Sequence, residues 1–158
     1  MIGKCVRLFW CMLAAVAVSA VCLFMIPMTE SLTAPQFALA GIFWASVVAE
    51  MVFLVSAGNL RRRIEKNSPH MKQQRGFGKL GIFCFAQNKE AKIVDGLQAA
   101  AIVYLVVIGM LHVDSLELVT LGIAGVYLLF HLHCILNGIL YKSIKHYQML
   151  IQKRREAK

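Results

Sequence analysis

Four long apolar segments dominate the chain, and short polar stretches separate them. They cover residues 8–28, 36–57, 93–111 and 116–141. A helix needs about 20 mostly apolar residues to cross the hydrocarbon core of a bilayer, and each segment is close to that length or longer. The pattern therefore predicts an all-α, polytopic membrane protein whose four transmembrane helices form a bundle of two hairpins.

The stretches outside these segments leave no room for a separate soluble domain. Hydrophobic residues make up 59% of the chain, which exceeds the roughly 45–50% of a soluble domain. The two longest of these stretches are a basic loop at 58–92 and a basic tail at 142–158. In the tail, apolar residues at helical spacing predict an amphipathic helix on the membrane surface. We therefore expect residues 1–158 to form a single integral membrane domain.

Lys and Arg are distributed very unevenly along the chain. Nine of the seventeen lie in residues 61–92, the other eight lie near the two chain ends, and the connectors 29–35 and 112–115 contain none. Loops rich in Lys and Arg remain on the cytoplasmic side of a membrane. The sequence therefore predicts a multi-pass protein of a bacterial-type cytoplasmic membrane, with both termini and the central loop in the cytoplasm.

The net charge of +9 does not indicate nucleic-acid binding, because the basic residues only bracket the apolar segments. The expected partners are anionic lipids of the inner leaflet, although orientation alone also accounts for the basic run. The expected lipid contacts are Arg61, Arg62, Arg63, Arg75 and Lys79. Residues 76–81 match G-x-G-x-x-G, but a dinucleotide site needs a preceding strand within a βαβ unit.

The residues that could hold a metal or catalyse a reaction are dispersed. On a helix, His131 and Cys134 share a face, whereas His133 points roughly 160° away from His131. A structural zinc site needs four suitably spaced ligands, and a haem would need histidines on facing helices. No nucleophile and base can be placed together from the sequence. We therefore expect a non-catalytic protein with no metal and no cofactor.

Polar residues recur within the last three apolar segments and predict a buried polar cluster. Its expected members are Glu50, Asp95, Gln98, His131, His133 and Asn137. Glu50 is eight residues before Gly58 and His131 is seven before Gly138, so both lie roughly 10–12 Å from the inner boundary. Because a lone carboxylate facing lipid is costly, we expect Glu50 to contact His131 or His133. Contact with water or backbone is the alternative.

Two functions of different classes fit this pattern. Small residues at 14–20, 99–101 and 122–125 allow close helix approach, which favours a non-catalytic assembly or accessory subunit joined to its own copies or to another membrane protein. The intramembrane Glu50 favours instead a small transporter or channel for protons, cations or cationic solutes. Positions that match at offsets of 80 and 85 residues fit a duplicated hairpin, and orientation rules account for them equally.

Overall fold

The computed structural model describes residues 2–67, 89–112 and 114–156. All of its regular elements are helices, and these residues contain no strand. The helices are α1 (Ile2–Met25), η1 (Ile26–Met28), α2 (Ala34–Asn67), α3 (Lys89–Met110), α4 (Leu116–Asn137) and α5 (Ile139–Glu156). Four stretches are long and apolar enough to cross a membrane: α1 with η1, the first 27 residues of α2, α3, and α4. The prediction of an all-helical protein with four such helices is confirmed.

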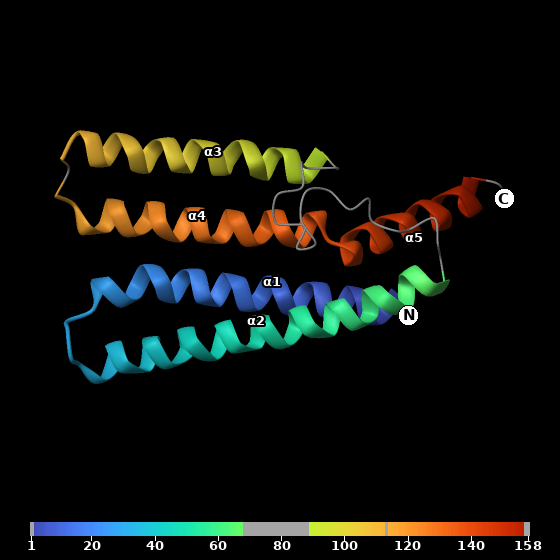
Figure 1. Ribbon diagram of the computed structural model, residues 1–158, viewed down its shortest axis with the longest axis horizontal. Helices are drawn as coiled ribbons and strands as arrows, with labels where there is room; N and C mark the ends of the chain where they lie inside the picture. The colour runs from blue at the N-terminus through green and yellow to red at the C-terminus, as the bar shows by residue number, and fades with distance from the viewer. Residues whose placement is uncertain (1, 68–88, 113, 157–158) are drawn as a thin grey trace.

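The four long helices lie side by side in one layer, in the order α2, α1, α4, α3 (Figure 1). α1 packs along both α2 and α4, and α4 packs along α3. The helices α1 and α4 therefore occupy the centre of the row, and α2 and α3 form its edges. This order determines which side chains can meet within the layer.

Helical structure extends into both ends of the basic stretch 58–92. α2 continues through its charged end to Asn67, and α3 begins at Lys89. No Gly or Pro interrupts residues 59–67, so nothing in the backbone ends the helix where the apolar segment ends. Pro69 follows two residues after Asn67, and proline disfavours helical backbone in the residue before it.

The ends of the helices follow local backbone chemistry. Pro27 lies in the first turn of η1, where its missing N–H is tolerated. The Ser115 hydroxyl caps α4 by accepting a hydrogen bond of 3.4 Å from the Leu118 N–H. In the two short connectors, Leu32 and His112 have positive φ angles of 63° and 50°, a left-handed conformation that reverses the chain in few residues.

The fourth apolar segment is broken near its end. The sequence predicts one helix over 116–141, but α4 ends at Asn137, and Gly138 is extended with φ −69° and ψ 157°. A Cβ atom at Gly138 would lie 3.0 Å from the Ile135 carbonyl oxygen, a tight approach that suits glycine. The amphipathic helix expected at 142–158 is α5, which starts at Ile139 and leaves the row at an angle (Figure 1).

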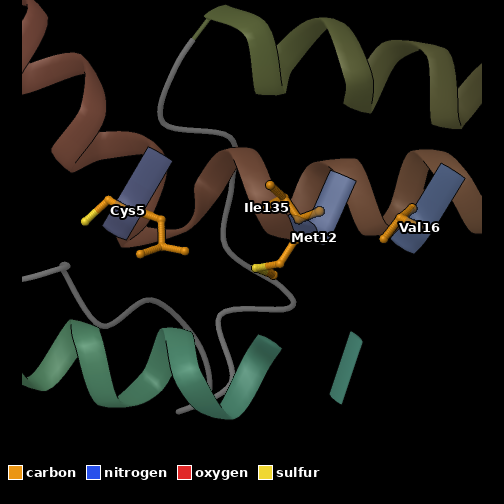
Figure 2. Packing of buried hydrophobic residues seen from close by; sticks show 5 residues of the cluster. Cys5, Met12, Val16 and Ile135 are labelled. Carbon is orange, nitrogen blue, oxygen red and sulfur yellow. The ribbon is translucent and has the colours of Figure 1, made fainter. Parts of the chain in front are cut away.

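The buried apolar core lies where α1, α4 and α5 meet. Cys5, Met12 and Val16 of α1 pack with Ile135 of α4 and Leu140 of α5 (Figure 2). Cys5 and Val16 are at most 2% exposed. Because this core sits at the junction of three helices, it fixes the rotation of α1 relative to α4.

Two polar and aromatic contacts hold α5 against the row. Tyr141 stacks on Phe9 of α1, with ring centroids 5.6 Å apart. One turn later, the Lys145 ammonium pairs with the Glu90 carboxylate of α3 and lies 5.2 Å from the Tyr141 ring centroid. α5 therefore contacts the central helix α1 and the edge helix α3.

Candidate functional site

Glu50 lies on α2 within its apolar span, ten residues before Leu60. At 1.5 Å per residue, this places it about 15 Å from that end of the span. The residue is only 7% exposed, so its side chain turns into the protein. An ionisable group at such a depth needs polar partners.

Ser19 of α1 provides the first partner. Its hydroxyl donates a hydrogen bond of 2.7 Å to Glu50 Oε1, and the residue is fully buried at 0% exposure. Because α1 lies between α2 and α4, the small side chain of Ser19 allows side chains of α2 and α4 to meet. Ser19 therefore links the three helices as well as binding the carboxylate.

Tyr127 of α4 contacts the same carboxylate. Its hydroxyl lies 3.3 Å from Oε1 and 3.4 Å from Oε2 of Glu50, and 3.0 Å from the Ser19 hydroxyl. Three helices thus supply hydroxyl or carboxyl groups to one buried point. We call Ser19, Glu50, Tyr127 and His131 the Glu50 group.

His131 follows Tyr127 by one turn of α4, and its ring is fixed from both sides. Its Nδ1 lies 2.8 Å from the Tyr127 backbone carbonyl oxygen, and its Nε2 lies 3.5 Å from Glu50 Oε2. A carbonyl oxygen can only accept, so Nδ1 carries a proton and donates it. In a neutral ring, Nε2 would then be an acceptor facing a carboxylate oxygen.

This geometry leaves one proton to be shared by His131 and Glu50. With the proton on Nε2, the pair is an imidazolium and a carboxylate. With the proton on Oε2, it is a neutral imidazole and a carboxylic acid. Without it, two lone pairs oppose each other inside the membrane, which is unfavourable. The contacts of the Glu50 group are therefore satisfied when the pair carries one proton.

A second polar group lies between α3 and α4. His133 Nδ1 hydrogen-bonds to Asp95 Oδ1, and the Asn137 amide nitrogen lies 3.1 Å from His133 Nε2. His133 and Asn137 are 8% and 3% exposed. If Nδ1 donates to the carboxylate and Nε2 accepts from the amide, a neutral imidazole satisfies both contacts. We call these three residues the Asp95 group.

The structure divides the six residues of the expected single cluster. Glu50 and His131 are together, and Asp95, His133 and Asn137 are together. His131 and His133 are two residues apart, which is about 200° around a helix, so one faces α2 and the other faces α3. Gln98 is half-buried on α3 and hydrogen-bonds to neither group within the described residues.

Ser19 and Tyr127 belong to the site but were missing from the sequence prediction. A signal for each was present. Ser19 is the only hydroxyl, amide, histidine or charged residue in 8–28, and Tyr127 lies four residues before His131 on the same helical face. Neither signal specified a partner, because sequence alone does not fix the rotation of one helix against another.

The expected lipid contacts lie at the end of α2 and beyond. Arg62 and Arg63 are exposed on the last turns of that helix. Arg61 belongs to the same helical stretch, and Arg75 and Lys79 lie outside the described residues.

Among the described residues, no three His, Cys, Asp or Glu side chains come together as metal ligands. Comparisons with protein-family models, with curated proteins and with solved structures found no match to this chain.

Proposed function

We propose that this chain is a small proton-coupled transporter or channel, and that the proton binds at Glu50 and His131. The observation that carries the proposal is the orientation of His131. Its Nδ1 is occupied by the Tyr127 carbonyl oxygen at 2.8 Å, and its Nε2 faces Glu50 Oε2 at 3.5 Å. Ionisable residues within membrane helices commonly form ion sites and proton relays.

The pair supports coupling because gain or loss of a proton changes its charge by one. A charge change in a buried site alters the free energy of every arrangement of the surrounding helices. Glu50 sits on the edge helix α2, whereas Tyr127 and His131 sit on the central helix α4. Protonation would therefore act on the contact between these helices, and the transported species would be a proton, a cation or a cationic solute.

The proposed orientation follows the basic residues. We place the two hairpins in a cytoplasmic membrane with both termini and the central loop inside. The distribution of Lys and Arg supports this. We place Arg61, Arg62, Arg63, Arg75 and Lys79 against anionic headgroups, and the exposure of Arg62 and Arg63 at the end of α2 supports the first part of that contact.

A specific observation favours a second function, that of an assembly or accessory subunit. In an 18-residue apolar stretch of each of α2 and α3, only 11% of the residues are buried inside the protein. Both are edge helices, so their outer faces are free for a second copy or for another membrane protein. Gly41 of α2 and Gly96 of α3 are exposed, with nothing within 4 Å of a Cβ atom placed there. Glycine permits close helix approach in lipid.

Proton flux into liposomes distinguishes the two functions. Purified protein is reconstituted with a pH-sensitive dye inside, and a pH gradient is applied. We expect flux in the wild type and its loss in Glu50→Gln. Glu117→Gln is the matched control, because Glu117 is an exposed acid in the first turn of α4.

The control should retain the flux. An inert wild type that co-purifies with a stable membrane-protein partner would contradict the transporter and support the subunit.

A further inference from the structure

The hydroxyl groups of Ser19 and Tyr127 have more acceptors within reach than protons to donate. Ser19 Oγ lies 2.7 Å from Glu50 Oε1 and 3.0 Å from the Val16 carbonyl oxygen. Tyr127 Oη lies 3.0 Å from Ser19 Oγ, and 3.3 Å and 3.4 Å from the two oxygens of Glu50. Each hydroxyl carries a single proton, so each donates to one acceptor at a time.

We propose that these two hydroxyls form a switch that follows the charge of Glu50. When Glu50 is ionised, Ser19 and Tyr127 both donate to the carboxylate. When Glu50 is protonated, it donates to His131 Nε2, Ser19 donates to the Val16 carbonyl, and Tyr127 donates to Ser19 Oγ. Both arrangements use the same positions of the heavy atoms.

Only protons move between the two states. One proton leaves His131 Nε2 and binds Glu50 Oε2, while the hydroxyl protons turn about the Cβ–Oγ bond of Ser19 and the Cζ–Oη bond of Tyr127. An unpaired polar group is unfavourable in a membrane interior, and the switch keeps the hydroxyl protons paired in both states. The inference rests on the proposed proton site and assigns Ser19 and Tyr127 as its positioning residues.

Few other titratable groups can influence this site. In the described residues, Tyr127 and His131 of α4 are the titratable groups in contact with the Glu50 carboxylate. On α1, the buried Cys22 lies one turn from Ser19, and Arg7 lies twelve residues away, about 18 Å along the axis. On α3, the nearest acid described is Asp95, which is paired with His133.

Infrared spectroscopy of the full-length protein in lipid at one fixed pH tests the switch, because the proton moves within the His131–Glu50 pair and the number of bound protons does not change. The C=O stretch of protonated Glu50 is assigned by its loss in Glu50→Gln. Ser19→Ala and Tyr127→Phe each remove one donor to the ionised form, so each should increase the ratio of protonated to ionised Glu50, read from the area of that band, about tenfold. Ser46→Ala is the control, because Ser46 lies one turn before Glu50 on α2 and donates to the Ile42 carbonyl at 2.9 Å.

The frequency of the C=O stretch distinguishes the switch from a Tyr127 hydroxyl that always donates to Glu50. The switch requires that Tyr127 donate to Ser19 when Glu50 is protonated, so Tyr127→Phe should leave the C=O stretch of protonated Glu50 unmoved. A displaced stretch would overturn the switch, as would an unchanged band area in both variants. If Ser19→Ala does not fold, Tyr127→Phe alone tests the switch, because that substitution removes only one oxygen atom.

The infrared and flux experiments can fail independently, so they test the switch and the proposed transporter separately. If the wild type carries no proton flux but the variants change the band area as stated, the transporter is refuted and the switch is retained. If the wild type carries flux and both variants leave the band area unchanged, the transporter is retained and the switch is refuted.

Discussion

A Cβ atom on Gly122 of α4 would lie 2.3 Å from Cδ2 of Leu105 and 3.1 Å from Cε1 of Tyr104, so side chains of α3 occupy the space above this glycine. α3 and α4 can therefore approach closely at this level. In lipid, such approach supplies the packing contacts that hold helices together.

We expect Gly122→Val to destabilise the α3–α4 contact by about 1–3 kcal/mol, because Leu105 must be displaced to admit the new side chain. Thermal unfolding in detergent measures this as a lower midpoint. Gly125→Val is the matched control, since nothing lies within 4 Å of a Cβ atom placed at Gly125. Equal losses in the two variants would show that helix propensity, and not the close approach, is responsible.

Asp95 and His133 should stabilise the fold as a coupled pair. Asp95→Asn and His133→Leu each leave a buried or half-buried polar partner, and each should cost about 1–3 kcal/mol. In the double variant neither partner is left unpaired as a charge, so the sum of the single losses should exceed its loss by about 0.5–3 kcal/mol. Additive losses in a double-mutant cycle would contradict the pairing.

The contact between α5 and α3 should weaken at high pH. The Glu90 carboxylate raises the pKa of Lys145 above its usual 10.5. A raised pKa means that the ion pair stabilises the folded state at pH values below 10.5 and is lost as the pH rises through the raised value. Thermal unfolding should therefore show the wild type to be more stable than Lys145→Met near neutral pH, and the difference should vanish in strong alkali.

Lys66→Met controls for the loss of a charge in this comparison, because Lys66 is exposed in the last turn of α2. A pH-independent difference between the wild type and Lys145→Met would show that the ion pair contributes nothing.

The orientation can be tested by thiol labelling in a background without native cysteines. A probe confined to the outside should modify Ser31→Cys, in the connector between η1 and α2, and should not modify Arg62→Cys at the other end of α2. Both positions are exposed, so a difference between them reports the side of the membrane. The reverse pattern would invert the proposed topology.

The spans were predictable because apolar length is a property of the sequence alone. That Glu50 and His131 lie at the same level was also predictable, since the rise of a helix is constant. The division of the polar residues into two groups was not predictable, because the rotation of each helix about its axis depends on packing. The contact of Cys5 and Met12 with Ile135 turns His131 toward α1 and α2. α2 runs past its apolar segment because charged residues continue a helix as readily as apolar ones, and Pro69 accounts for its end at Asn67.

Helix α4 carries both histidines on one continuous backbone, so the Glu50 group and the Asp95 group are mechanically linked. Any turn of α4 about its axis that withdraws His131 from α2 must also displace His133 relative to α3, because the angle between the two side chains is fixed by the helix. Loss or distortion of the contact between Asp95 and His133 thus changes the free energy needed to rotate α4 and withdraw His131 from α2. A rotation of α4 therefore couples its contact with α2 to its contact with α3.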